Sequence, residues 1–442
     1  MRVRSRILLA ATLSFVATAR LTASSMPDAS DTNSWLETAT RGLIDGCKIR
    51  ADDGTWFFTP DGKGNYRALW TRDFAYMVEN AGDLIDPAEV EHALRAIVAG
   101  VRADGATPDR VQPDGVSVYT GGPPEHPLGE PNLDNAPFLV IAIDAHLKRL
   151  PSSRAEALFR EWAPSLRRAM DWVPRGDAGL VWNDPNRPHS PYGFTDTIAK
   201  TGDLFFESLL YWDASRRLAV RFRQTGNGEA AREFRSRCRA IQRHLEPLWD
   251  SDAGMFLAAS VDCRQIDVWG NAFAVWLDFP LGRKRDRIVS WLVANQTRYL
   301  WRGQVRHLVT GEYWQRLLAP VERERYQNGA YWATATGWVM QALARRDPDL
   351  ARDVWNELIA DFRAGGVCEC VNQGYRQLPS YVVSATNPLA AARRLRYDRP
   401  RLHAPGTPTS APRGGPSERA AGPHPHPAEG NALGIPSHTP TP

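Results

Sequence analysis

The chain has 442 residues and a formal net charge of +4, from 54 Lys and Arg against 50 Asp and Glu. Basic and acidic residues are interspersed, and there is no concentrated basic stripe of the kind that binds nucleic acid, so we expect no nucleic-acid partner. A content of 43% hydrophobic and 24% charged residues is typical of a globular protein with a large core.

The N-terminus has the pattern of a targeting segment. Residues 1–6 are basic, residues 7–17 are apolar, and Ala17 and Ala19 are small residues suited to cleavage. The apolar run is too short to cross a bilayer comfortably. We therefore expect a signal peptide over 1–19, no stable membrane insertion, and a secreted, periplasmic or endomembrane-lumen protein.

From residue 33 to 397 the sequence predicts one helix after another. Asp86 is a suitable N-cap, Pro87 a first helical residue and Glu89 a third, and apolar residues follow at helical spacing. The same pattern predicts helices over 133–150, 204–220, 230–248, 288–293, 330–344 and 350–362. Alternating strand patterns are scarce. An all-α chain of helical hairpins is expected, with function in its long loops.

Periodicity alone fits either a closed helical toroid or a helical solenoid. After Tyr397 the composition changes to Pro, Gly, Ala, Ser and His, with almost no large apolar residues. Such a segment cannot bury a core, so 398–442 is predicted to be disordered and 33–397 to form the folded domain.

The five cysteines are odd in number and form neither a disulfide framework nor a zinc motif. We therefore expect no metal and no cofactor.

The segment Trp70-Thr71-Arg72-Asp73 places an Arg beside an Asp, with an aromatic wall next to them. Such a polar clamp can hold sugar hydroxyls. The alternative is a helix N-terminus, with Asp73 as a cap and Arg72 in a surface ion pair. Asp134 likewise precedes a helix, where it is either an N-cap or a substrate contact.

Asp196 lies in an aromatic loop with Tyr192 and Phe194, ahead of a helix. Apolar surroundings raise the pKa of a carboxyl group, and this makes a proton donor. Asp203 is a rival, but it follows Gly202 at a predicted helix start, where the charged form is favoured. Asp196 is therefore the predicted acid.

Glu369 follows two glycines that allow a sharp turn, and it lies between two cysteines. It is either a solvated loop residue or a base that activates water. Most of the 16 Trp and 12 Tyr residues belong to the core, and a few are candidate platforms for sugar rings. The candidates for stacking are Trp70, Trp182, Tyr192 and Trp332, and Trp269 is a candidate for lining the pocket.

Taken in order, these motifs resemble the six-hairpin (α/α)6-barrel glycosidases, which include glucoamylases, trehalases and mannosylglycerate hydrolases. The matching segments are 70–73, 132–136, 192–196, 267–272, 326–332 and 369–385. Where glucoamylases place Trp-Glu-Glu at the acid, this chain has Phe194-Thr195-Asp196, and trehalases differ there too. The identity of the sugar therefore does not transfer.

The resemblance implies an all-α (α/α)6 toroid with long loops at one end and exo-acting hydrolysis of a terminal glycosidic bond. Asp196 would be the general acid and Glu369 the general base of an inverting reaction, with Arg72 and Asp73 holding the terminal sugar. Asp134 precedes a helix as such Asp residues do in these enzymes.

Other classes stay open. A carbohydrate-binding protein without catalysis is one. An isoprenoid cyclase or prenyltransferase is another, although no Asp-rich cluster is visible. A uronyl hydrolase or a phosphorylase on the same fold is a third.

Overall fold

The computed structural model describes residues 29–123 and 125–395, which belong to one compact unit. The predicted signal peptide at 1–19 and the predicted tail at 398–442 fall outside these residues. Within them, no helix is both long enough and apolar enough to cross a bilayer.

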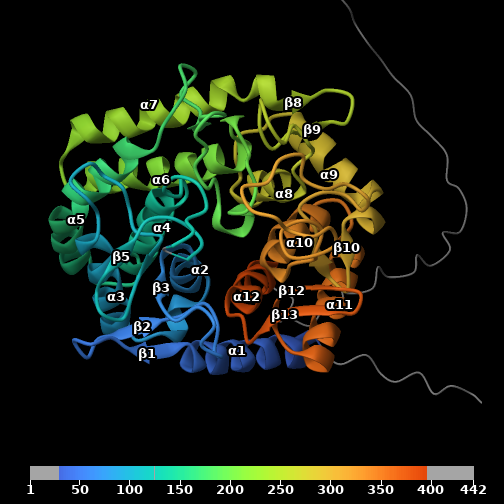
Figure 1. Cartoon of the computed structure of the whole chain (residues 1–442), viewed down its shortest axis with the longest axis horizontal. Coiled ribbons are helices and arrows are strands. Elements are labelled where there is room, and N and C mark those ends of the chain that lie inside the picture. Colours follow the sequence, from blue (N-terminus) through green and yellow to red (C-terminus); the bar gives the residue numbers. More distant parts are fainter. Residues whose placement is uncertain (1–28, 124, 396–442) are drawn as a thin grey trace, which may run out of the picture. The chain divides into compact units, whose positions relative to one another are not determined.

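Six inner helices form a closed ring (Figure 1). Each packs against the next, and α12 packs back against α2. Every residue of α4 is buried, as expected for a helix that is apolar on all sides. The closed ring answers the question that periodicity left open, because the helices form a toroid. The inner helices are α2 (Thr71–Ala81), α4 (Asn135–Leu147), α6 (Phe205–Gln224), α8 (Val268–Trp276), α10 (Thr336–Ala344) and α12 (Val383–Leu395).

Six further helices pack outside this ring, one ahead of each inner helix in the chain. They are amphipathic, with one buried stripe and a charged outer face; in α5 the buried residues recur at intervals of three and four. Asp86 caps α3 as predicted, since its Oδ1 accepts from the Ala88 backbone N–H at 2.8 Å. The outer helices are α1 (Ala29–Gly46), α3 (Pro87–Ala99), α5 (Ser152–Trp172), α7 (Gly228–His244), α9 (Lys284–Ala294) and α11 (Pro348–Gly365).

The predicted helices at 204–220, 230–248, 288–293 and 350–362 are confirmed with shifted ends. The stretch predicted at 133–150 ends earlier, at Leu147, and α5 follows after a short loop. The stretch predicted at 330–344 is helical only from Ala333, where a 3-10 turn leads into α10.

Short antiparallel strands lie in the connections between helices and form small sheets. Strands β3, β4 and β5 form one three-stranded sheet, and the other strands pair as hairpins. The strands are β1 (Lys48–Arg50), β2 (Trp56–Phe58), β3 (Leu69–Trp70), β4 (Arg110–Val111), β5 (Ser117–Val118), β6 (Trp182–Asn183), β7 (Gly202–Asp203), β8 (Trp249–Asp250), β9 (Met255–Phe256), β10 (Leu300–Trp301), β11 (Gln304–Val305), β12 (Cys368–Asn372) and β13 (Tyr375–Pro379).

The β12–β13 hairpin corrects the expected position of Glu369, which lies on strand β12 and not in a loop. Asn372 pairs with Tyr375 across a two-residue turn, and Gly374 there has a φ of 68°. Such a turn favours glycine because it needs a positive φ. Side chains alternate along a strand, so Glu369 faces away from Cys368 and Cys370.

Candidate active site

A cavity of about 460 Å³ lies where the segments before four inner helices meet. Residues 70–73 form the start of α2, 193–197 precede α6, Tyr326 precedes α10 and Tyr381 precedes α12. The inner helices therefore turn the same end toward one site. The lining residues are Pro60, Asn65, Tyr66, Arg67, Ala68, Trp70, Arg72, Asp73, Arg110, Gln112, Gly122, Pro123, Leu128, Gly193, Phe194, Asp196, Thr197, Tyr326, Glu369 and Tyr381.

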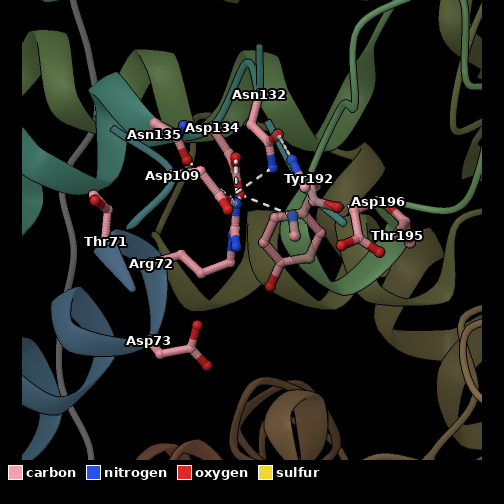
Figure 2. A network of polar contacts seen from close by, with 12 residues as sticks. Thr71, Arg72, Asp73, Asp109, Asn132, Asp134, Asn135, Tyr192, Thr195 and Asp196 are labelled. Carbon is pink, nitrogen blue, oxygen red and sulfur yellow. Dashed lines mark hydrogen bonds and ion pairs between the residues drawn. The ribbon is translucent and has the colours of Figure 1, made fainter. Parts of the chain in front are cut away.

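Arg72 lies in the first turn of α2, so the backbone at 70–73 is a helix N-terminus. Its side chain is not in a surface ion pair, because it is only 3% exposed. Figure 2 shows its guanidinium among the polar side chains of Asp109, Asp134 and Asn135. Nε donates to Asp134 Oδ2 at 2.9 Å, and Nη2 donates to Asp109 and Asn135. Within the described residues Nη1 donates to no protein atom, so both of its N–H groups are available where Arg72 lines the cavity.

Asp134 differs from both sequence interpretations. Its side chain makes no cap hydrogen bond to α4, and it is fully buried behind the lining residues. Besides Arg72, its Oδ2 accepts from the Gly193 backbone N–H at 2.9 Å. Asp134 therefore joins the start of α2 to the loop that carries Asp196. The backbone of Asp134 is already in the αR conformation, whereas a capping residue usually has an extended backbone, and its carboxylate does not bond the helix N–H groups.

Gly193 packs directly on Arg72. A Cβ atom at this position would lie 1.8 Å from Arg72 Nε and 2.0 Å from its Cδ. Arg72 cannot move aside without leaving its two carboxylate partners. Only glycine therefore fits at position 193.

Asp196 is 9% exposed and lines the cavity. Its Oδ1 accepts from Gln327 Nε2 at 2.7 Å, while Oδ2 lies toward Gly121, where a Cβ would be 3.1 Å away. Burial raises the pKa of Asp196 to about 7, and the Arg72 charge and the Gln327 hydrogen bond limit that rise. The carboxyl group can therefore hold a proton near neutral pH.

Asp203, the rival for this role, lies on β7 and is not among the lining residues. It does not cap α6, because the N-cap position belongs to Leu204. Partial burial raises the pKa of Asp203, which is opposite to the expected stabilisation of its charged form. Asp203 pairs with Trp182 in the strand ladder and lies two residues before the first residue of α6, one residue before the N-cap.

Glu369 lines the same cavity as Asp196 and is 2% exposed. Its Oε1 accepts from the Tyr66 hydroxyl at 3.1 Å. Its Oε2 is buried and has no hydrogen-bond partner in the described part of the chain. Burial raises the pKa of Glu369 well above its usual range, and the charges of Asp73 and Asp196 raise it further. The alternative of a solvated loop residue is therefore wrong.

Asp73 lines the same cavity as Asp196 and Glu369. It is buried, and its Oδ1 accepts from the Tyr381 hydroxyl at 2.6 Å. Burial raises the pKa of Asp73 to about 6, while the Arg72 charge and the Tyr381 hydrogen bond oppose that rise. Asp73 is not the N-cap of α2, because that position belongs to Trp70, and its carboxylate is an acceptor on the cavity wall.

Four aromatic residues expected at the pocket are absent from its lining. Tyr192, Trp269 and Trp332 are at most 1% exposed, and Trp182 lies on strand β6. Trp269 stacks on His307 at 3.8 Å between ring centroids, and Trp332 meets the Phe194 ring edge-on at 5.6 Å. They are part of the main core and support Phe194, which does line the cavity. Trp70 lies in the wall as expected.

Several lining or supporting residues were not predicted from the sequence. Tyr66 contacts Glu369, and Gln327 contacts Asp196. Asp109 completes the surroundings of Arg72. A signal for Tyr66 existed in the turn-forming run Asp61–Asn65, because such a run on a helical scaffold marks a loop that carries function. Among the described residues, no group of three or more His, Cys, Asp or Glu side chains is arranged to hold a metal ion.

The ring of six inner and six outer helices defines the (α/α)6 toroid, the fold expected from the sequence motifs. No family model matches the sequence, and a search of curated proteins finds no match either.

Solved structures do match the fold. The mannosylglycerate hydrolase of Thermus thermophilus in complex with glucose is similar, with a TM-score of 0.58 and 16% identity over 80% of this chain and 99% of that chain. The rhamnosidase of Klebsiella oxytoca with rhamnose bound gives 0.59 and 16%, over 83% of this chain and 64% of its own. The glucoamylase of Saccharomycopsis fibuligera gives 0.53 and 14%, over 84% and 96%.

Proposed function

We propose that this protein is an exo-acting glycoside hydrolase that cleaves a terminal glycosidic bond with inversion. One observation carries the proposal. Asp196 and Glu369, far apart in the sequence, line one cavity, and each has one oxygen held by a donor and the other without a partner in the described residues. Two carboxyl groups across a sugar are what glycosidic hydrolysis requires. The fold is similar to those of a mannosylglycerate hydrolase, a rhamnosidase and a glucoamylase, and this similarity supports a glycoside hydrolase.

In this mechanism Asp196 protonates the departing oxygen while Glu369 removes a proton from water. Gln327 donates to Asp196 Oδ1, which leaves Oδ2 to carry the proton. Glu369 Oε2 is the free acceptor for a water proton. Burial raises both pKa values, and like charges in one cavity resist joint ionisation, so a pair holding a single proton is the expected resting state. Inversion requires the two carboxyl groups to be about 6.5–9.5 Å apart, with a water between them.

Exo-action is supported by the wall beside the carboxyl pair. Asp73 offers an acceptor and Arg72 Nη1 a donor for the hydroxyls of a terminal sugar, and Trp70 offers an apolar face. The cavity, at about 460 Å³, lies toward the small end of ligand pockets, which span roughly 300–1,000 Å³. A terminal unit of a glycoside fits this space better than an extended chain.

The identity of the sugar is best found by a panel of α- and β-linked glucosides, mannosides, rhamnosides and trehalose. The panel should include glycosides with a carboxylate on the leaving group. Arg67 lines the cavity, is exposed, and forms no ion pair within the described residues. A second solved structure of the Thermus thermophilus mannosylglycerate hydrolase contains D-glycerate, a molecule that carries a carboxylate.

Leaving-group chemistry separates the roles of the two carboxyl groups. A dinitrophenyl glycoside needs no protonation to depart, whereas a methyl glycoside does. We expect Asp196→Asn to lower kcat on the methyl glycoside by about 10²–10⁴-fold and to cost far less on the dinitrophenyl glycoside. Glu369→Gln should lower both by similar factors, because each reaction needs the activated water.

The reverse pattern would exchange the two assignments. Equal binding of a sugar by wild type and both variants, with no turnover by any of them, would instead identify a binding protein. A proton-NMR time course adds an independent test. The first-formed sugar should have the anomeric configuration opposite to that of the substrate, and retention would contradict inversion.

A further inference from the structure

We propose that Gln327 is the positioning residue of the acid–base pair: its amide holds Asp196 through Oδ1, so that Oδ2 is the oxygen presented to the glycosidic bond. This inference rests on the proposed function and extends it to a residue outside the cavity lining. Gln327 is 1% exposed and is not among the residues that line the cavity. It acts through Asp196 and is not expected to touch the substrate.

The Gln327 amide uses its full hydrogen-bonding capacity. Nε2 donates to Asp196 Oδ1 at 2.7 Å and to the Gly193 carbonyl oxygen at 3.1 Å. Oε1 accepts from the Thr197 backbone N–H at 2.9 Å and from the Thr197 hydroxyl at 2.7 Å. A primary amide has two donor hydrogens and two acceptor lone pairs, so no further partner can be taken.

These contacts also fix which way the amide faces. The Thr197 backbone N–H can only donate, so an amide turned by 180° would place an NH₂ group against it and the amide oxygen against the Asp196 carboxylate. Both exchanges would lose a hydrogen bond between buried groups. The partners of the amide therefore place its nitrogen toward Asp196 Oδ1.

The segment that carries Gln327 is held firmly from outside the cavity. Glu324 and Tyr326 have φ values of 62° and 39°, which is unusual for residues other than glycine. Glu324 accepts from Arg306 Nη1 at 3.0 Å and from Asn372 Nδ2 at 2.8 Å. Such backbone conformations persist where the surroundings over-determine them, and they gather at functional sites. Gln327 is thus presented to Asp196 by a loop tied to strand β12, which carries Glu369.

The contact has a chemical consequence for Asp196. A donor on Oδ1 suits the carbonyl-type oxygen of a protonated carboxyl group, which leaves the O–H on Oδ2. The same donor stabilises the charged form and opposes the rise in the Asp196 pKa caused by burial. The other charged and titratable groups that act on Asp196, or that Asp196 acts on, are Arg72, Asp109, Asp134, Glu369, Tyr66 and Tyr326.

The test compares Gln327→Met and Gln327→Glu with Gln304→Met. Gln304 is an equally buried glutamine whose Nε2 donates to Asp361 Oδ2 at 2.9 Å, and it does not line the cavity. The full-length protein is labelled with ¹³C at aspartate Cγ, and the Asp196 signal is assigned by its loss in Asp196→Asn. Its titration, Tm, and kcat against pH are then measured for each protein.

We expect Gln327→Met to raise the Asp196 titration midpoint by about one unit and Gln327→Glu to raise it further, because a second carboxylate adds like charge. The alkaline limb of kcat should move up with it, and kcat at the optimum should fall about tenfold to hundredfold from misplacement. Gln304→Met should lower Tm without moving either profile.

The inference would be overturned if the titration midpoint of Asp196 were the same in Gln327→Met as in wild type and in Gln304→Met. The titration needs no substrate, so it separates the two proposals. A shifted midpoint in a protein that hydrolyses no glycoside would leave the contact standing and remove the proposed function. Hydrolysis with unshifted profiles would remove this inference alone.

Discussion

The contact between Gly193 and Arg72 shows how closely the site is packed at the scale of single residues. A side chain at position 193 would overlap Arg72, and Arg72 is tied to Asp134 and Asp109 in a buried cluster of charges. Asp134 in turn accepts from the backbone of Gly193. One missing Cβ therefore allows the helix that carries Asp73 and the loop that carries Asp196 to meet.

We expect Gly193→Ala to lower the free energy of unfolding by roughly 3 kcal/mol, because it combines overpacking with a strained buried ion pair. Activity should fall as well, since Asp196 lies three residues further on. Urea unfolding measures the first effect. Gly42 is the control, because a Cβ there meets nothing within 4 Å in helix α1. Gly42→Ala should be neutral or slightly stabilising, and equal losses in both variants would contradict the packing argument.

At this scale the sequence identified residues by chemistry and could not determine which side of a wall they occupy. The sequence indicates four polar groups in apolar or Gly-rich surroundings, Arg72, Asp73, Asp196 and Glu369, and all four line one cavity. The large aromatic residues at 192, 269 and 332 are indicated by residue type alone, and they are core residues behind Phe194. An aromatic ring is equally suited to the core and to stacking on a sugar. Residue type alone therefore does not show whether the ring faces the cavity.

At the scale of elements, the loop between β2 and β3 contains a turn that is held by the carboxylate of Asp61. Asp61 is buried; its Oδ1 accepts from the backbone N–H groups of Lys63 and Asn65, and its Oδ2 accepts from that of Tyr66 at 2.9 Å. This turn ends at Tyr66, whose hydroxyl donates to Glu369. The loop between β2 and β3 therefore owes its shape, and its contact with Glu369, to Asp61.

We expect Asp61→Ala to release this turn and to lower the free energy of unfolding by about 1.5–3 kcal/mol, the usual contribution of hydrogen bonds to a charged group. The kcat should fall because Tyr66 no longer holds Glu369 Oε1. Asp250→Ala is a matched control. Asp250 also accepts two backbone N–H groups of a tight turn, and it does not line the cavity. A loss of kcat in the control as large as in Asp61→Ala would count against a specific role.

Elements with strong local signals were predictable, and those formed by long-range pairing were not. Helix α3 had a cap, a proline and a periodic apolar face, and its start was placed correctly. In strand β12 the alternation of apolar and polar residues is limited to Cys368-Glu369-Cys370, because apolar Val371 follows directly, and both faces of the strand are buried there. Its strand conformation depends on pairing with β13, which single-sequence periodicity does not report.

At the scale of the whole described unit, closure of the ring depends on α12 packing against α2, helices that are among the farthest apart in the sequence. Helical periodicity reports which face of each helix is apolar and gives no information on which helix it meets. The resemblance of ordered motifs therefore carried the prediction of a toroid. Closure also brings Tyr381 to Asp73, and the hairpin before α12 brings Glu369 to Tyr66.

The buried carboxyl groups inside this ring should leave a signature in the dependence of global stability on pH. Burial raises the pKa of folded Asp196 to about 7 from 3.8, so the folded protein binds this proton more tightly than the unfolded chain does. The stabilisation is present in full below the unfolded pKa and is lost as the pH rises through the folded pKa. Above that pH, the folded state holds a poorly solvated charge.

Asp196→Asn removes this charge and keeps an acceptor for Gln327. We therefore expect the variant to be more stable than wild type at pH 8, by up to roughly 4 kcal/mol for a shift of this size, and to match it below about pH 4. Asp104→Asn should show the opposite sign, because a hydrogen bond from exposed Arg102 lowers the pKa of Asp104. Urea unfolding of the three proteins at pH 4, 6 and 8 measures the difference. Burial penalises only the ionised form of the carboxyl group. If Asp196→Asn were more stable than wild type by the same free energy at every pH, desolvation of this carboxylate would not be the cause.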